Sequence, residues 1–490
     1  MDGSLSPLEL LHPDGTAPRA VVVGDGCPDQ LVPSSLLAED GPCDLVVIAP
    51  GPGEGETTEW FRRALDLARR RLVADGVVYL LVTRRARRRA LRALARSGLS
   101  ADAAFLHLPS ADQSRQLVPL TARPASYAFS NLVPAQPSRR RLALAILSLP
   151  AGERLLARMA PVVGVVARQS PSRQICQWLF DLDGVATPAP APVITASWQD
   201  PRSSFVLHRF AQGDAPPLVA KIRPSAVSGV GPAAEAEILG TLAPAARQAG
   251  VETPEPLRVE SLDGRSLLLE TAVSGRSAAA VLGDDPRGVP ALQARLARWL
   301  ESWSRLTARP QPLEASRLTA DLIAPAELLA PLIADGGEYV DWLAERSAEL
   351  AGTTVPLVSA HNDLTMANVM VAGSGSLGVV DWEAARADGL PLMDFFYSAA
   401  DAAAAASRYD DRTAAFVDCF GPEGCRSAAL AELETSLRRA LGLSPAVAQL
   451  CFHACWLHHG ANEHRAVGHE STARPFLEIV RWVARHRARA

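Results

Sequence analysis

Apolar and polar positions follow different periods along this chain, and each period predicts a type of element. Between residues 18 and 108, short apolar runs such as AVVVGDG, CDLVVIAP and GVVYLLV alternate with longer stretches such as TTEWFRRALDLARRR. The longer stretches repeat apolar side chains every three or four positions, which is typical of amphipathic helices. Strands that alternate with helices in this way predict an α/β region with a mainly parallel sheet.

The same region carries a glycine pair, Gly24 and Gly26, directly after its first strand. A dinucleotide or S-adenosylmethionine site needs such a loop, and also an acid about 20 residues further on for the ribose hydroxyls. The segment CDLVVIAP…LDLARRRLVADGVVYLLV resembles the second half of a class I methyltransferase domain. Only about 17 residues separate Gly26 from the next strand, so a complete domain does not fit. The resemblance implies a truncated, degenerate Rossmann-like domain over residues 1–150, a scaffold rather than a catalyst.

Arginines are concentrated at residues 84–96, on an expected amphipathic helix. A solvated helix face is the ordinary role of such a run, and phosphate binding is the alternative. Residues 151–190 predict a helical connector that closes with the proline-rich stretch ATPAPAPV, the expected domain boundary.

From residue 191 to residue 275 the pattern predicts an antiparallel sheet. VITASW, SFVLHRFA and LVAKI are three expected strands, joined by the turns QDPRS and QGDAPP. The first turn has no glycine, unlike the loop that covers the phosphates in protein kinases. Ser203, Ser204 and backbone amides are therefore the candidates for hydrogen bonds to a phosphate at this turn.

Lys221, in LVAKI, is the only lysine among the 49 basic residues. Its apolar strand is similar to the V-A-I-K strand of kinases, where the ammonium binds nucleotide phosphates and a helix carboxylate. Glu235 on the following helix is the predicted carboxylate, and Glu237, about 200° around that helix, is the alternative. After the next hairpin, Glu270 and Ala272 are expected against the nucleotide base. A solvated strand end is the alternative interpretation of Glu270.

The stretch HNDLTMANVMVAGSGSLGVVDWE, residues 361–383, carries the densest chemistry. His361, Asp363 and Asn368 have the H-x-D-x-x-x-x-N spacing of a kinase catalytic loop. Two short strands joined by a Gly-Ser turn would return Asp381 to the loop. Asp363 is the predicted acceptor of the hydroxyl proton, while Asn368 and Asp381 would bind Mg²⁺ and Glu383 would extend the metal site. His361 completes the catalytic set by bracing the loop. A non-catalytic Asp/Asn-rich turn is the alternative.

Three motifs, HNDLTMANVMV, GVVDWE and LPLMDFF, together resemble the aminoglycoside phosphotransferase and choline kinase family, which has a protein-kinase-like fold. The resemblance covers about residues 190–480. It implies a bilobal α+β domain, with an N-lobe over residues 191–275. A C-lobe over 276–490 would hold the catalytic loop and a helical acceptor-binding region. The resemblance also implies ATP or GTP and Mg²⁺ as cofactors, and a bracing role for Asp394 beneath the catalytic loop.

Composition limits the remaining possibilities. A chain of 490 residues is too long for one ordinary domain. A net charge of −4 gives no sign of a nucleic-acid partner. The longest uncharged apolar run, residues 142–150, is far shorter than the roughly 20 residues of a membrane span. The start of the chain lacks a signal pattern, and the seven cysteines include no C-x-x-C pair. We therefore expect reduced thiols and a cytoplasmic location.

These observations predict an ATP-dependent phosphotransferase for a hydroxyl of a small polar metabolite: an aminoglycoside, a sugar, a glycan precursor or a natural product. A pseudokinase or scaffold that binds nucleotide or a glycan precursor is one alternative, favoured by the glycine-free turn. A bifunctional methyltransferase–kinase is another. The complete set Lys221, Asp363, Asn368 and Asp381 favours catalysis, because a binding module needs no proton acceptor. The sequence leaves the acceptor and the oligomeric state open.

Overall fold

The computed structural model describes most of the chain in two compact units. The N-terminal unit comprises Met1–Ala236 and Pro256–Ala272, and the C-terminal unit comprises Glu237–Glu255 and Val273–Ala490. The described residues are 7–12, 18–28, 31–32, 34–38, 41–51, 56–108, 110, 115–132, 137–169, 176–182, 190–195, 204–211, 216–223, 231–262, 265–467 and 474–487.

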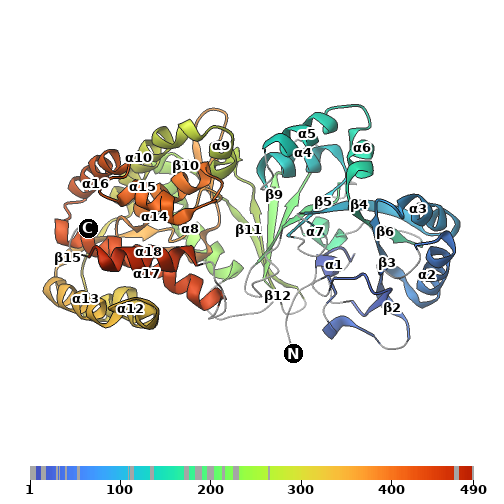
Figure 1. The fold of residues 1–490 in the computed structure, drawn as a ribbon, viewed down its shortest axis with the longest axis horizontal. Coiled ribbons are helices and arrows are strands. Elements are labelled where there is room, and N and C mark those ends of the chain that lie inside the picture. The colour runs from blue at the N-terminus through green and yellow to red at the C-terminus, as the bar shows by residue number, and fades with distance from the viewer. Residues whose placement is uncertain are drawn as a thin grey trace. The chain divides into compact units, whose positions relative to one another are not determined.

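A single sheet of eleven described strands runs through the N-terminal unit, in the order β1-β2-β3-β6-β4-β5-β7-β8-β9-β12-β11 (Figure 1). The strands are β1 (Ala20–Val23), β2 (Cys43–Ile48), β3 (Leu72–Thr83), β4 (Ser100–Leu108), β5 (Gln116–Pro119), β6 (Val162–Arg168), β7 (Val193–Thr195), β8 (Phe205–Arg209), β9 (Leu218–Arg223), β11 (Pro256–Leu262) and β12 (Arg265–Thr271).

Strand direction differs from the expectation of a mainly parallel sheet. β1, β2 and β3 are parallel, whereas β6 lies between β3 and β4 and is antiparallel to both. The prediction of a helical connector over 151–190 is wrong at Val162–Arg168, because this apolar run forms β6 in the middle of the sheet. The remaining neighbours are antiparallel as well. Apolar alternation encodes which face of a strand is buried, but not the direction of the neighbouring strand. The parallel arrangement is therefore confined to the first three strands.

The parallel strands are covered on both faces, as is usual for parallel sheets. In β2, Val46 and Ile48 pack in one core with helices such as α2 (Thr58–Arg71), while Leu45 and Val47 pack in the core on the other side. Successive side chains of a strand point to opposite faces, which explains this division. The described helices of the unit are α1 (Pro7–Leu10), α2 (Thr58–Arg71), α3 (Arg87–Arg96), α4 (Ala122–Asn131), α5 (Pro137–Leu147), α6 (Gly152–Met159) and α7 (Gln177–Asp181).

The strands predicted for two different domains meet in this sheet. Gln116 and Leu117 of β5 pair with Thr195 and Ile194 of β7. One apolar core extends along the sheet from β2 to β8, β9 and β12. Residues 186–189 of the predicted boundary lie outside the described residues. The α/β strands and the predicted N-lobe strands thus share one sheet and one core.

The C-terminal unit is mainly helical and contains two small sheets, β10-β17-β16-β13 and β14-β15-β18. Their strands are β10 (Val251–Glu252), β13 (Arg276–Ser277), β14 (Arg309–Pro312), β15 (Thr354–Ala360), β16 (Val369–Val371), β17 (Leu377–Val379) and β18 (Arg386–Gly389). The described helices of at least six residues are α9 (Ala278–Asp284), α10 (Val289–Thr307), α12 (Ala324–Leu329), α13 (Gly336–Leu350), α14 (Met393–Ala406), α15 (Arg412–Phe420), α16 (Ser427–Ala440), α17 (Pro445–Val467) and α18 (Pro475–Arg485), and α8 (Pro232–Ala249) begins in the N-terminal unit.

Helix α14 forms the centre of the C-terminal core. It is apolar on nearly every side, and almost all its residues are buried. A helix that is apolar all round belongs in the interior of a protein. Any carboxylate on such a helix must find hydrogen-bond donors, because an unpaired buried charge is costly. α14 carries two, Asp394 and Asp401, and both are buried.

Within the described part of the chain, no single helix is both long and apolar enough to cross a membrane. The stretches Ser427–Ala440 and Pro445–Arg465 pass the length and composition criterion only as a pair, and that pair is bent by 117°. The seven cysteines are free thiols, and Cys43, Cys176, Cys419, Cys451 and Cys455 are buried.

Candidate active site

The predicted catalytic loop follows the end of β15, and Asp394 at the start of α14 accepts hydrogen bonds from its backbone. The backbone N–H groups of His361 and Asn362 donate to the two carboxylate oxygens of Asp394, at 2.7 and 2.9 Å. Asn362 has a positive φ of 62°, so the chain turns sharply there. Burial raises the pKa of Asp394, while His361 and the two N–H bonds oppose the rise. The carboxylate thereby fixes the backbone that presents Asp363.

His361 braces the loop through both ring nitrogens. Nε2 lies 3.0 Å from the carbonyl oxygen of Val380, and Nδ1 accepts a bond from the backbone N–H of Asp363 at 3.3 Å. A neutral imidazole with its proton on Nε2 satisfies both contacts. The ring also packs on Trp382, with centroids 4.8 Å apart. His361 thus links the loop to the strand end that carries Asp381.

The β16–β17 hairpin forms in the predicted place, with Val369 opposite Val379. The backbone N–H of Val380 donates to the carbonyl of Asn368 at 2.9 Å, so the hairpin's end is tied to the catalytic loop. The Asn368 amide donates to the backbone oxygen of Asp363 at 2.9 Å and to its carboxylate at 3.3 Å. Asp381 follows with φ 66°. The hairpin therefore returns Asp381 to the loop that carries Asp363 and Asn368.

Burial and the neighbouring charges change the pKa of Asp363. Burial, followed by the neighbouring carboxylates Asp381, Asp401 and Glu383, raises the pKa of Asp363 to about 8, and the Asn368 amide opposes the rise. A carboxylate with a raised pKa is a stronger base than a solvated one. The same carboxylates would attract a cation, and a cation beside them would lower the pKa of Asp363. The arrangement suits proton acceptance next to a metal.

Asp401 is a site residue that the sequence analysis missed. Its fully buried carboxylate accepts from the backbone N–H of Met366 at 2.6 Å, from the Tyr409 hydroxyl at 3.0 Å and from Arg412 at 2.7 Å. Met366 lies between Asp363 and Asn368 in the catalytic loop. A spacing of seven residues from Asp394 places both aspartates on one face of α14, and this signal is visible in the sequence. Two carboxylates of α14 therefore bind the backbone of the loop, one at its start and one at Met366.

The N-terminal unit contains the second group of predicted residues. Lys221 on β9 is buried, and its Nζ lies 2.5 Å from Glu235 Oε1 of α8 and 3.5 Å from Glu270 Oε1 of β12. Glu237 is exposed, so Glu235 is the partner. Glu270 is 2% exposed, which rules out the interpretation as a solvated strand end. One ammonium therefore lies within ion-pair distance of two buried carboxylates.

The other predicted nucleotide-binding positions lie near this cluster or outside the described residues. The backbone N–H of Ala272 donates to the carbonyl of Pro217 at 3.0 Å, which extends the pairing of β12 with β9 by one residue. Ser204 is half-buried directly before β8, and Ser203 lies outside the described residues.

The donor set fits Mg²⁺ and nucleotide phosphates. No group of three His, Cys, Asp or Glu side chains within the described ranges is placed to hold a metal by itself. Mg²⁺ needs fewer protein ligands, because it is usually bound by one or two carboxylates together with phosphate oxygens and water. Asp381, Asn368 and the nearby Glu383 supply oxygens of this kind.

The comparisons with known proteins agree with this chemistry. Residues 203–427 match the model of the phosphotransferase enzyme family. The matched stretch contains Lys221, Glu235, the catalytic loop and Asp381, and it supports a protein-kinase-like phosphotransferase in this part of the chain. No curated protein matches the chain.

Solved structures similar to the chain include three phosphotransferases. Aminoglycoside phosphotransferase APH(3'')-Id from Streptomyces rimosus is 17% identical with a TM-score of 0.33, covering 52% of this chain and 89% of its own. Macrolide 2'-phosphotransferase type I is 14% identical, with a TM-score of 0.36 and coverages of 62% and 94%. Choline kinase LicA from Streptococcus pneumoniae is 12% identical, with a TM-score of 0.35 and coverages of 58% and 89%. Likenesses at this level name no acceptor for this chain.

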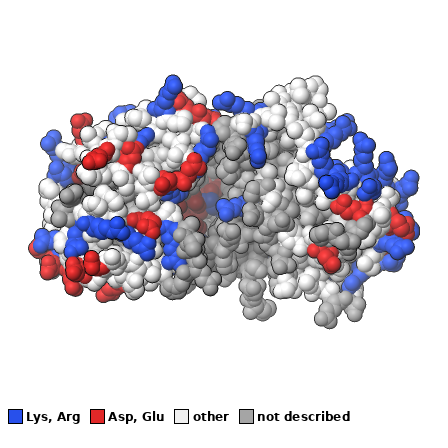
Figure 2. Space-filling model, viewed as in Figure 1, with Lys and Arg blue, Asp and Glu red and all other residues white. Residues whose placement is uncertain are grey.

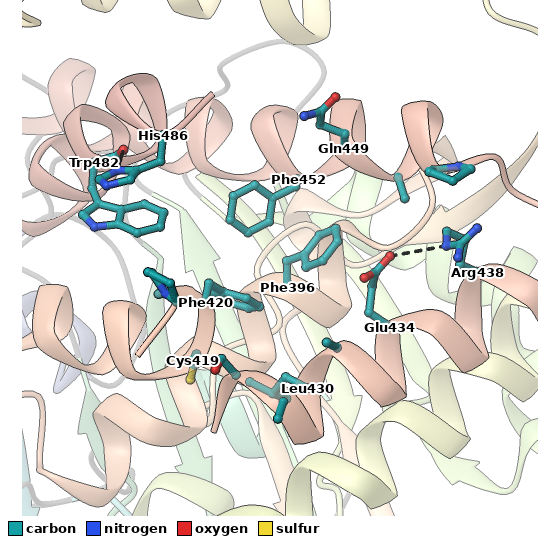
Figure 3. A pocket seen from close by; sticks show the side chains of 17 residues that line it. Phe396, Cys419, Phe420, Leu430, Glu434, Arg438, Gln449, Phe452, Trp482 and His486 are labelled. Atoms are coloured by element: carbon teal, nitrogen blue, oxygen red, sulfur yellow. Dashed lines mark hydrogen bonds and ion pairs between the residues drawn. The ribbon is translucent and has the colours of Figure 1, made fainter. Parts of the chain in front are cut away.

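A cavity of about 530 Å³ also lies among helices α14 to α18 of the C-terminal unit. Phe396 and Phe420 line it, and the Glu434–Arg438 pair lies at its wall (Figure 3). No residue of the catalytic loop lines this cavity. Phe396 is two positions after Asp394, about 200° around α14, so it points away from the loop. The cavity is therefore separate from the position at which Asp363 would take up a proton.

Proposed function

We propose that the protein is an ATP- or GTP-dependent, Mg²⁺-dependent phosphotransferase that phosphorylates a hydroxyl of a small polar metabolite. The observation that carries the proposal is the catalytic loop of the C-terminal unit. Asp363, Asn368 and Asp381 are gathered by one hairpin, and Asp394 holds the loop through two backbone bonds. A structural turn needs no such base with a raised pKa.

Each residue has a separate part in this proposal. Asp363 accepts the proton of the acceptor hydroxyl, and His361 holds the loop in register with the end of β17. Asn368 and Asp381 would hold Mg²⁺, with Glu383 nearby. Lys221, oriented by Glu235, would bind the nucleotide phosphates, and Ala272 would lie against the base. The nucleotide with its metal supplies the phosphoryl group.

The N-terminal region completes the proposal. We infer that residues 1–150 form the truncated methyltransferase-type domain together with β6 (Val162–Arg168), which lies in the stretch 151–190 expected as a helical connector. Residues 191–275 would form the N-lobe and 276–490 the C-lobe. The parallel strands β1 to β3, with α2 between the second and third, support this assignment. We also propose a cytoplasmic location, in keeping with seven free thiols.

The test is Asp363→Asn, assayed by ATP consumption against a panel of hydroxyl acceptors. Asparagine preserves the size of the side chain but cannot accept the proton, so we expect turnover to fall by about 10²–10⁴-fold. Asp410→Asn, at an exposed position of the same unit, is the matched control and should keep full activity. Turnover within tenfold of the wild type would show that Asp363 is not the base. Absence of turnover by the wild type with every acceptor would favour a nucleotide-binding pseudokinase.

A further inference from the structure

The N-terminal unit contains a cavity of about 980 Å³ at one edge of its sheet. Its lining includes residues 25–28, 49–51 and 83–85, which follow or end β1, β2 and β3. These three strands are parallel, so their carboxyl ends meet at this edge. A Cβ on Gly26 would lie 2.2 Å from the carbonyl oxygen of Pro50, so glycine allows the first two of these segments to meet. Open α/β sheets bind ligands in the crevice outside such strand ends.

Positive side chains outnumber negative ones by one at the wall of this cavity. Arg84, Arg85 and Arg89 line it and are exposed, against two acidic lining residues, Asp25 and Glu56. Arginine side chains also gather over α3 and α6 on the face shown in Figure 2. Exposed arginines gathered at one side of a hollow attract ligands of the opposite sign.

Of the three arginines, only Arg89 has its guanidinium hydrogen-bonded to described residues of the cavity. The Glu56 carboxylate accepts a bond from the Thr83 hydroxyl at 2.8 Å. Arg89 donates to the backbone oxygen of Glu56 at 2.9 Å, which anchors its guanidinium. The guanidinium groups of Arg84 and Arg85 make no hydrogen bond or ion pair with the part of the chain that the structure describes. Both are therefore available to a ligand.

The position of the acids argues against a nucleoside at this edge. A Rossmann-type site places an acid about 20 residues after its glycine loop to bind the ribose hydroxyls. Counted from Gly24 and Gly26, that position falls on Asp44 and Val46, which both lie within β2 and not at its carboxyl end. The nearest acid, Asp44, lies near the start of β2, at the opposite edge, where it accepts a bond from the Arg19 backbone N–H at 3.0 Å. The arginines of the cavity therefore favour an anionic ligand over a nucleoside.

We propose that this cavity binds a small metabolite that carries two or more phosphate-type negative charges. Arg84 and Arg85 would contact the charged oxygens, since a guanidinium matches the geometry of a phosphate with paired N–H donors. Arg89 adds a third positive charge from the first turn of α3. The site goes beyond the proposed phosphotransferase activity, because all its residues lie in the N-terminal unit and outside residues 203–427.

The test is calorimetric titration of the full chain with inorganic pyrophosphate in the presence of EDTA. We expect the wild type to bind, and Arg84→Gln/Arg85→Gln to lower the affinity at least about tenfold. The matched control is Arg92→Gln/Arg96→Gln, which removes two exposed arginines of α3 that do not line the cavity and should bind as the wild type does. Circular dichroism checks that both variants fold.

Two further arms separate this site from other sources of binding. Asp381→Asn alters the predicted phosphotransferase site and should leave pyrophosphate binding unchanged. A wild type that does not bind pyrophosphate, or an equal loss of affinity in the two arginine variants, overturns the proposal. It is equally overturned if S-adenosylmethionine or a single-stranded oligonucleotide binds more tightly than pyrophosphate in the same buffer.

Discussion

Replacing Lys221 by Arg separates the charge of this residue from its shape. The lysine side chain is 7% exposed, with Nζ 2.5 Å from Glu235 and 3.5 Å from Glu270. Arginine keeps the positive charge but replaces a compact ammonium by a longer, planar fork. Lys221→Met, the companion variant, removes the charge and keeps a side chain of similar length. The pair of variants therefore tests whether the site needs only a positive charge or needs the compact ammonium of lysine.

The expected magnitudes differ for stability and for activity. Lys221→Met leaves two buried carboxylates without their cation, and breaking a buried ion pair costs about 3–5 kcal/mol of unfolding free energy. Lys221→Arg retains the cation, so its cost is that of overpacking, about 1–3 kcal/mol. Activity should be more sensitive, because a misplacement of about 1 Å in a phosphate-positioning group costs about 100-fold. We therefore expect kcat/KM of the arginine variant to fall at least tenfold while the fold is retained.

Two assays decide the outcome. Urea unfolding followed by tryptophan fluorescence measures the stability of both variants, and ATP consumption with an accepted hydroxyl substrate measures kcat/KM. Wild-type turnover by Lys221→Arg would refute the argument from shape, and the nucleotide phosphates would have to be bound elsewhere. Equal destabilisation by Arg and Met would instead show that the arginine does not pair with Glu235 and Glu270.

Two further predictions concern the catalytic loop and the buried histidines. Asp401→Asn should lower kcat roughly ten- to hundredfold by loosening the loop at Met366, with KM for ATP nearly unchanged; an equal effect of the exposed Asp410→Asn would contradict this role. Burial lowers the pKa of His107 to about 4 and that of His453 to about 3, so the folded protein keeps both neutral while the unfolded chain protonates below pH 6.5. Stability should fall from pH 7 to pH 5, by about 2 kcal/mol per such histidine at pH 5, and a flat urea midpoint over this range would contradict the argument.

Local features of the fold could be predicted from the sequence. The strands LVAKI and VMV, the Gly-Ser hairpin and the helix that carries Glu235 all form where their patterns place them. Their signals come from neighbouring positions in the chain, such as period, turn residues and the spacing of Asp363 and Asn368. Local geometry also states that only one of Glu235 and Glu237 can face Lys221, because positions two apart on a helix face different sides.

Only the tertiary structure decided which distant segments meet. It placed β6 between β3 and β4, and so made most of the expected parallel sheet antiparallel. It joined the α/β strands to the predicted N-lobe strands through β5 and β7. It also buried Glu270 beside Lys221 and brought Asp401 to the catalytic loop. The sequence pattern states how apolar each position is. Which strands pair, in which direction they run, and how deeply a side chain is buried depend on contacts between residues far apart in the chain.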